Sequence, residues 1–315
     1  MSTDTVTQKP RLKSNYYYLG DELRETFGQK VYKISLDSGF TCPTRDGSKG
    51  TKGCFYCGQT GSHYSNAVYT RTVATQIEEG KSFMRNRHGA DKFIAYFQSY
   101  TSTYGDVSLL KAKLGEALED PDIVGLNLST RPDCLDDERL AILAEHMLDK
   151  YHWLELGLES GHDSVLKRCG RGHGYAEFET TFKQAKARGF RICVHLILGL
   201  PGETDEMAID TMKRLADLGI DGIKLHNLHI IKNSVFELEY KLNRIPLMSL
   251  PEYCDLVGRI LPQIPENVVI HRLTGEAPPN LMLAPDWSFN KAKAMNALDT
   301  FIIEKQIVQG SNFRP

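Results

Sequence analysis

Short apolar segments that favour β-strands alternate with longer amphipathic segments along the first 232 residues of the chain. The expected strands are residues 31–36, 93–97, 123–128, 153–158, 191–198 and 222–225. The expected helices between them are residues 73–87, 107–119, 136–150, 175–188 and 203–218. A strand and a helix that recur about every 30 residues predict successive βαβ units and a parallel sheet. This period suits a barrel as well as an open doubly wound sheet.

The pattern changes after residue 232, where prolines divide the chain into short helical pieces and one strand-like run, 268–273. We expect residues 233–315 to form a C-terminal α/β extension that packs on residues 18–232. Residues 1–17 are expected to form a flexible polar tail.

Composition describes a globular protein, with 41% hydrophobic and 25% charged residues among 315. The formal net charge is −2, so a nucleic-acid partner would need a local basic patch. A polar N-terminus and the lack of a long apolar run predict a cytoplasmic protein that has no membrane partner.

Seven cysteines without a secretory signal argue against a disulfide framework. Cys42, Cys54 and Cys57 lie in one glycine-rich loop with the spacing Cys-x11-Cys-x2-Cys. Zinc in a structural site takes four protein ligands, and His63 is a nearby candidate for the fourth. An iron–sulfur cluster held by three cysteines would leave one iron open for chemistry. The four remaining cysteines are expected to be buried apolar residues: Cys134, Cys169, Cys193 and Cys254.

The expected strands each end at a segment of unusual polar residues, and carboxyl ends of parallel strands are where functional groups gather. Those segments are 39–57, 98–104, 129–133, 159–163, 199–204 and 226–229. We therefore expect one site at this end of the sheet.

The cysteine loop resembles the cluster loop of radical S-adenosylmethionine (SAM) enzymes, in the long-spaced variant of proteins similar to the catalytic subunit of elongator. A narrower resemblance, to the bacterial YhcC/YtqA group, is carried by residues 39–47 (GFTCPTRDG), 96–103 (YFQSYTST), 130–134 (TRPDC), 154–158 (LELGL), 199–203 (GLPGE) and 222–226 (GIKLH). Residues 273–278 (LTGEAP) resemble the YtqA branch, also called MnmL, which is linked to modification of the wobble uridine of tRNA.

The resemblance implies a partial (β/α)6 TIM-type radical SAM barrel. It also implies that Cys42, Cys54 and Cys57 hold a [4Fe-4S] cluster whose open iron binds SAM. An external one-electron donor such as flavodoxin or ferredoxin would drive cleavage of SAM to a 5′-deoxyadenosyl radical. The radical chemistry belongs to the cofactor, and the protein positions the reactants.

Other site residues follow from the same resemblance, and each could instead be an ordinary salt-bridge or capping residue. The candidates for contact with SAM are Gln98, Ser99, Arg131, Glu159, Arg171, His195 and Gly199. The common Gly-Gly-Glu form of the motif at Gln98 and Ser99 is absent. Lys224, His226 and His229 lie on or just beyond the sixth expected strand, where they form a predicted catalytic cluster facing the substrate. A zinc-binding fragment is the alternative for the two histidines.

The resemblance suggests tRNA as the substrate, with a carboxymethylaminomethyl group on the wobble uridine converted to an aminomethyl group. Positively charged and aromatic residues suited to RNA occur at Lys9, Arg11, Lys13, Tyr16, Tyr17 and Tyr18, and again at Arg85, Arg87 and His88. Both runs could equally be solvated surface. Two other functions remain open, a radical SAM enzyme acting on a small metabolite or protein, and a non-catalytic binding module stabilised by zinc.

Overall fold

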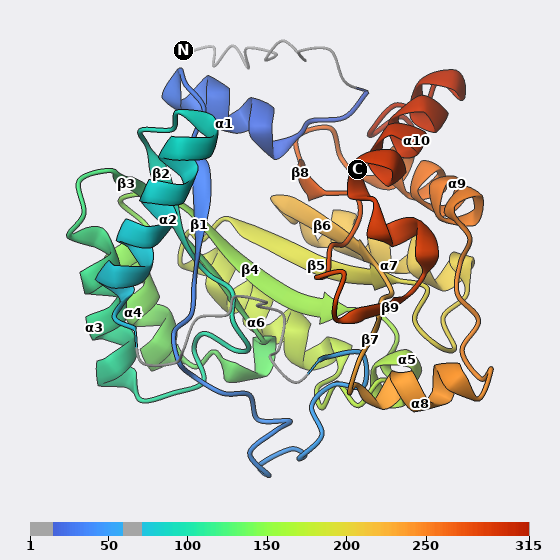
Figure 1. Ribbon diagram of the computed structural model, residues 1–315, viewed down its shortest axis with the longest axis horizontal. Helices are drawn as coiled ribbons and strands as arrows, with labels where there is room; N and C mark the ends of the chain where they lie inside the picture. The colour runs from blue at the N-terminus through green and yellow to red at the C-terminus, as the bar shows by residue number, and fades with distance from the viewer. Residues whose placement is uncertain (1–14, 59–70, 315) are drawn as a thin grey trace.

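The computed structural model describes residues 15–58 and 71–314 (Figure 1). Its main sheet has seven parallel strands in the order β1-β2-β3-β4-β5-β6-β8 and curls into a half-barrel. The strands are β1 (Tyr32–Leu36), β2 (Phe93–Phe97), β3 (Ile123–Thr130), β4 (Tyr151–Glu159), β5 (Ile192–Leu198), β6 (Gly222–Asn227) and β8 (Val269–Arg272). All six strands expected in the first 232 residues are present, and the predicted α/β partial barrel is confirmed.

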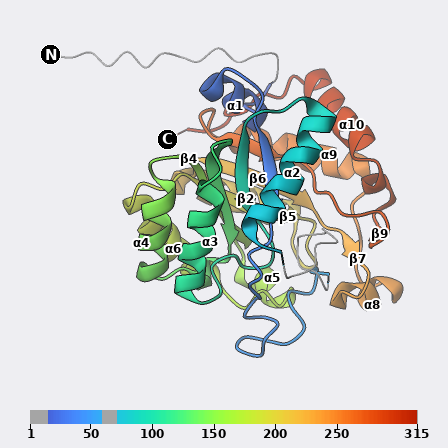
Figure 2. The same cartoon turned by 60° about the vertical axis from the view of Figure 1, so that its left-hand side comes forward.

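Helices between the strands cover the outer face of the sheet (Figure 2). They are α2 (Val73–His88), α3 (Val107–Leu118), α4 (Asp137–Met147), α6 (Tyr175–Ala187) and α7 (Asp205–Leu218), whereas the short α5 (Asp163–Arg168) lies at the carboxyl end of the strands (Figure 1). Several begin at a residue whose side chain accepts a backbone hydrogen bond, as Asp106 does for α3 and Asp136 for α4. Gly219 ends α7 in the left-handed conformation, at φ +80°, which glycine adopts without steric cost.

The C-terminal extension supplies the seventh strand of the barrel sheet. β8, within the predicted run 268–273, pairs in parallel with β6. The other elements of the extension and its junction are β7 (Ile230–Ile231), α8 (Val235–Lys241), α9 (Leu250–Ile260), β9 (Met282–Ala284) and α10 (Lys291–Glu304). Three short 3₁₀ helices complete the described chain, η1 (Pro132–Cys134), η2 (Leu261–Gln263) and η3 (Asp286–Phe289). The barrel therefore includes residues from both predicted segments.

The aromatic residues just before α1 (Leu19–Phe27) hold the outer edge of β8. Tyr16 is buried, and its hydroxyl donates to Asp299 of α10 at 3.0 Å. The carbonyl of Tyr17 accepts a hydrogen bond from the backbone N–H of Ile270 at 2.8 Å. Covering the edge of β8 in this way leaves fewer unpaired backbone groups there. Residues 15–17 are thus part of the fold, whereas Lys9, Arg11 and Lys13 lie outside the described residues.

The two faces of the sheet have different chemistry. On β4, Leu154 and Leu156 pack into the main hydrophobic core under the outer helices, while Glu155 between them points to the other face. His195 of β5 and Lys224 of β6 are paired in register on that inner face. The concave interior of the half-barrel therefore carries charged and polar residues around Glu155, next to a smaller apolar cluster that includes Trp153 and Cys193. Among the described residues, no helix is long and apolar enough to cross a membrane.

Candidate functional site

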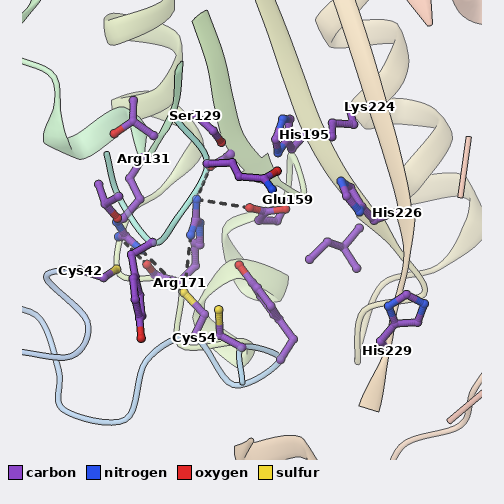
Figure 3. Close-up of a pocket in the computed structure, with 18 of the residues that line it drawn as sticks. Cys42, Cys54, Ser129, Arg131, Glu159, Arg171, His195, Lys224, His226 and His229 are labelled. Atoms are coloured by element: carbon purple, nitrogen blue, oxygen red, sulfur yellow. Dashed lines mark hydrogen bonds and ion pairs between the residues drawn. The ribbon is translucent and has the colours of Figure 1, made fainter. Parts of the chain in front are cut away.

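The carboxyl ends of the strands surround a pocket that contains about 1210 Å³ of space, part of it open to solvent (Figure 3). Eleven of the thirteen predicted site residues line it: Cys42, Cys54, Cys57, Gln98, Arg131, Glu159, Arg171, His195, Lys224, His226 and His229. Ser99 is fully buried outside this lining, and Gly199 lines a smaller cavity with Met248 and Trp287. The structure therefore brings most of the predicted residues together and leaves these two apart.

The three cysteines lie on the irregular segment that follows β1, at the opposite end of the molecule from α1 (Figure 1). Hydrogen bonds within the segment fold it on itself, with Arg45 N donating to the Cys42 carbonyl and Cys57 N to the Cys54 carbonyl, each at 2.9 Å. Phe55 N donates to the carbonyl of Cys169 at 2.9 Å, which ties the segment to the end of α5. Cys42 and Cys54 are buried, and Cys57 is half-buried. The other four cysteines are buried, as predicted.

Two arginines approach the sulfur of Cys54. Nη1 of Arg131 lies 3.7 Å from this sulfur and Nη1 of Arg171 lies 3.6 Å from it (Figure 3). Burial acts to raise the pKa of the Cys42 thiol, but the charge of Arg131 and hydrogen bonds from threonine side chains outweigh it, so that this pKa is lowered. Burial, together with the neighbouring Cys54, raises the pKa of Cys57 to about 12. Positive charge is thus concentrated beside part of the thiol set.

An ion-pair chain fixes the position of Arg131. Its Nε and Nη2 atoms donate to the two carboxylate oxygens of Asp133, each at 2.9 Å, and Nη2 also donates to the Arg171 carbonyl at 2.7 Å. Lys49, on the cysteine segment, donates to the same carboxylate at 2.7 Å. Burial opposes ionisation of Asp133, but the hydrogen bonds and charge of Arg131 and the Lys49 bond lower its pKa to about 2. Arg131 is therefore held by protein groups on all sides of its guanidinium.

Arg171 and Glu159 form a second buried pair. Arg171 Nη2 lies 3.4 Å from the Glu159 carboxylate and donates to the Gly157 carbonyl. Burial raises the pKa of Glu159, although Arg171 acts in the opposite direction. A Cβ atom at Gly157 would lie 2.7 Å from both Arg171 and Glu159, so only glycine leaves room for the pair. The backbone of Glu159 is left-handed, at φ +77°, an uncommon conformation that is often found at functional sites.

Glu155 is the centre of a buried network that sequence reasoning missed. Its carboxylate accepts hydrogen bonds from Tyr96 at 2.6 Å, Lys224 at 2.9 Å and Lys33 at 3.1 Å, and lies 2.7 Å from Nε2 of His195. Burial opposes its ionisation, but the charges of Lys224 and Lys33 keep its pKa well below the usual value. The available signal was a single charged residue inside the apolar run 153–158, which predicts an inward-facing carboxylate.

The predicted catalytic residues lie on the wall formed by β6 and the segment after it (Figure 3). Burial lowers the pKa of Lys224 to about 8, although Glu155 acts to raise it. Burial and the charge of Arg272 lower the pKa of His229 to about 4, and the same causes with Lys224 lower that of His226. At neutral pH this wall therefore carries lysine and arginine charges beside neutral imidazoles.

The donor set suits an iron–sulfur cluster with an open iron. Three thiols line the pocket, and among the residues described they are its only cysteines. Within residues 15–58 and 71–314, no three His, Cys, Asp or Glu side chains converge to hold a single metal ion. His63, the candidate for a fourth zinc ligand, lies outside the described residues.

Comparison with known proteins decides the family. The profile of the Radical SAM superfamily matches residues 47–215, and that of the Radical_SAM C-terminal domain matches residues 220–303. Protein YhcC of Escherichia coli K12 is 39% identical over 293 residues, which cover 93% of each chain. The chain belongs to the radical SAM superfamily. The cofactors of this family are a [4Fe-4S] cluster and SAM, as the resemblance implied.

Further comparisons agree with membership of this radical SAM family. Uncharacterized protein YtqA of Bacillus subtilis is 36% identical over 302 residues, covering 96% of this chain and 94% of its own. The solved archaeal Elp3 of Methanocaldococcus infernus shares the fold, with a TM-score of 0.69 and 16% identity over 89% of this chain and 64% of that one. The predicted resemblance to the elongator-like YhcC/YtqA group is confirmed.

Those residues expected to contact RNA that the structure describes are not at the pocket, and Lys9, Arg11 and Lys13 lie outside the described residues. Arg85 and His88 lie at the end of α2, next to the amino end of the sheet, where Arg85 pairs with Asp122 at 2.6 Å and His88 stacks on Tyr32. The Tyr16–Tyr18 segment also lies at this end, beside β8. Arg85 and His88 lie here because α2 ends just before β2 begins, and the tyrosines lie here because they pair with β8, whereas the pocket is formed where strands end.

Proposed function

We propose that this radical SAM enzyme modifies the wobble uridine of tRNA and converts a carboxymethylaminomethyl group into an aminomethyl group. The observation that carries the proposal is the charge of the pocket wall that faces the cysteines, where Lys224 and Arg272 are adjacent in register. The substituent ends in a carboxylate, which such a wall attracts. The choice of tRNA as the substrate rests on the resemblance to the YtqA branch.

In this proposal the two sides of the pocket have separate roles. Cys42, Cys54 and Cys57 would hold the cluster, which would supply reductive cleavage of SAM once a donor such as flavodoxin or ferredoxin had provided an electron. Gln98, Glu159 and His195 offer polar atoms to SAM along the neighbouring strand ends. Gln98 is oriented by the bond from its Nε2 to the Ser35 hydroxyl at 2.8 Å.

The β6 and β8 side binds and orients the uridine substituent. The conversion breaks the bond between the amine nitrogen and the carboxymethyl group. It would begin with transfer of a hydrogen atom from the carbon between the amine and the carboxylate to the 5′-deoxyadenosyl radical. Loss of one further electron to the oxidised cluster and addition of water would then release the two carbons as glyoxylate and leave the aminomethyl amine. Holding the carboxylate at the far wall would direct the carbon that loses hydrogen toward the cysteine side. Precise placement of this kind contributes a large part of enzymatic rate enhancement.

The direct test is an anaerobic assay of 5′-deoxyadenosine with the reconstituted enzyme. We expect release to rise when tRNA from a strain that lacks this gene is added, and to rise less with tRNA from the parent strain, which already carries the product. Cys54→Ala gives the background. If neither tRNA changes the release of 5′-deoxyadenosine, the result argues against tRNA as the substrate and favours a small metabolite or protein.

A genetic test is independent of reconstitution. Mass spectrometry of tRNA nucleosides from the deletion strain should show the carboxymethylaminomethyl form accumulating at the expense of the aminomethyl form. Restoring the wild-type gene should reverse the change, whereas the Cys54→Ala gene should not. An unchanged wobble-uridine profile would overturn the proposal.

A further inference from the structure

Five cationic side chains line the pocket, and four of them are already engaged by protein groups. Arg45 donates to the Gly58 carbonyl at 2.5 Å. Arg131 is bound by Asp133, Arg171 contacts Glu159, and Lys224 is bound by Glu155. The fifth is Arg272, for which no hydrogen bond or ion pair exists within the described part of the chain.

Arg272 has a defined position on a rigid element. It is the last residue of β8 and lies opposite Lys224 in the register of β6 and β8. It is half-buried and contributes to the pocket lining. Tyr17 bonds to one edge of β8 and β6 pairs with the other. The backbone position of Arg272 is therefore fixed, which limits the positions that its guanidinium can take.

The carboxylates near Arg272 form their hydrogen bonds and ion pairs with other groups. Glu155, which is not itself part of the pocket lining, is shared by Lys33, Lys224 and His195. Glu276, near the end of β8, bonds to Lys291 at 2.6 Å, and Arg272 acts on it only as a nearby charge that helps to lower its pKa. Glu159, the other carboxylate of the lining, lies beside Arg171.

The remaining neighbours of Arg272 are cationic or neutral. Its charge contributes to lowering the pKa of Lys224, His226 and His229. A half-buried guanidinium whose N–H groups have no hydrogen-bonded carboxylate among the described residues favours binding of an anion, because its fork of N–H donors matches the two oxygens of a carboxylate or phosphate.

We propose that Arg272 is a substrate-binding residue that takes an anionic group, a carboxylate or a phosphate, at the wall of the pocket opposite the cysteines. The choice between these anions rests on the proposed function. For a carboxymethylaminomethyl uridine the group is the carboxylate of the substituent, whereas a phosphate would come from the RNA backbone. Lys224 lies beside the bound anion and adds a second positive charge.

The first arm of the test needs no tRNA. Sarcosine carries the amine and carboxylate of the substituent, and inorganic phosphate represents the backbone. Titration calorimetry on the reconstituted protein should show binding of one of them to the wild type, at least tenfold weaker binding to Arg272→Met, and intermediate binding to Arg272→Lys. Arg188→Met, which removes an arginine that follows the last residue of α6 and pairs with Asp137, is the matched control and should bind as the wild type does.

The second arm compares tRNAs that carry a carboxymethylaminomethyl or an aminomethyl uridine. If the anion is the carboxylate, Arg272→Met weakens binding of the first tRNA at least tenfold and leaves the second unchanged. If the anion is phosphate, the variant weakens both tRNAs equally. Cluster absorbance and melting temperature equal to those of the wild type show that the variant is folded and loaded.

The two proposals fail in different ways. A wild-type enzyme that binds neither tRNA, but binds sarcosine or phosphate through Arg272, would overturn the tRNA proposal and keep the anion site. If Arg272→Met equals the wild type toward sarcosine, phosphate and both tRNAs, or if the wild type binds none of them, the anion site is overturned.

Discussion

Nη1 of Arg131 lies 3.7 Å from the sulfur of Cys54. The guanidinium cannot turn away, because its other nitrogens hold Asp133 and the Arg171 carbonyl. A buried positive charge beside a thiolate ligand stabilises negative charge on the ligand and on what it binds. Hydrogen bonds and charges around the sulfurs are among the factors that set the potential of an iron–sulfur cluster.

Loss of the Arg131 charge should lower the reduction potential of the cluster. In Arg131→Gln, we expect a decrease of about 59 mV or more, the one-electron equivalent of a tenfold change in the reduction equilibrium. Anaerobic titration followed by electron paramagnetic resonance measures it. Arg188→Gln is the control on the outer helix, and equal potentials in the two variants would contradict this role for Arg131.

Substitution of a pocket cysteine and of a core cysteine should have opposite effects on cluster assembly. Cys54→Ala should abolish both the brown colour of the reconstituted protein and the cleavage of SAM, because it removes one of three thiols that line the pocket. Cys254→Ala, in α9 and within the hydrophobic core, should keep both. Iron content, absorbance and 5′-deoxyadenosine release are the measurements. Equal loss in both variants would refute the assignment of the cluster ligands.

Removing the Glu155 charge should destabilise the fold. Glu155→Gln leaves Lys224 and Lys33 buried or half-buried without their counter-ion, which costs about 3–5 kcal/mol for a broken buried pair. Anaerobic denaturant unfolding should show the change. Glu145→Gln removes a carboxylate from an exposed pair with Lys111 and should leave the unfolding midpoint unchanged. Wild-type stability in Glu155→Gln would show that the network contributes no net stability.

Glu203 should make stability depend on pH. Burial raises its pKa to about 7 from an ordinary 4.5, although the Ser160 hydroxyl donates to it at 2.5 Å and acts in the opposite direction. Since the folded state holds this proton more tightly than the unfolded chain, stability from Glu203 is full below pH 4.5 and is lost as pH rises through 7.

Glu203→Gln should remove this dependence, because the amide cannot ionise. Relative to the wild type, we expect the variant to gain about 1–3 kcal/mol in unfolding free energy between pH 5 and pH 8. Denaturant unfolding at the two pH values measures the difference. A wild type and a variant whose stabilities change in parallel with pH would contradict the raised pKa.

Much of the architecture could be predicted because local patterns carry it. The run 93–97 is a strand with the predicted bounds, and α2 and α6 end within one residue of their predicted ends. The cysteine spacing indicated a cluster loop, and the family comparison agrees with it. Alternation along β4 carried a signal for Glu155 as an inward-facing charge, which sequence reasoning did not use, and it could not have named the partners.

Those partners are distant in the chain, since Glu155 meets Lys33, Tyr96 and Lys224 from 122, 59 and 69 residues away. For the same reason, sequence reasoning missed Arg272, which lies in an extension that was expected only to pack on the barrel. The placement of β8 beside β6 turned that residue toward the pocket.

The sequence by itself determined the succession of strands and helices, the cluster loop and the residues that follow each strand. These properties depend on hydrophobic period, turn residues and spacing, which act between near neighbours in the chain. Only the tertiary structure decided which charges meet, which described cation has no hydrogen-bonded partner, and that Arg85, His88 and the Tyr16–Tyr18 segment lie away from the pocket. Those outcomes depend on strand order and register, and a shift of one residue in register would turn the side chains of a strand to the other face of the sheet.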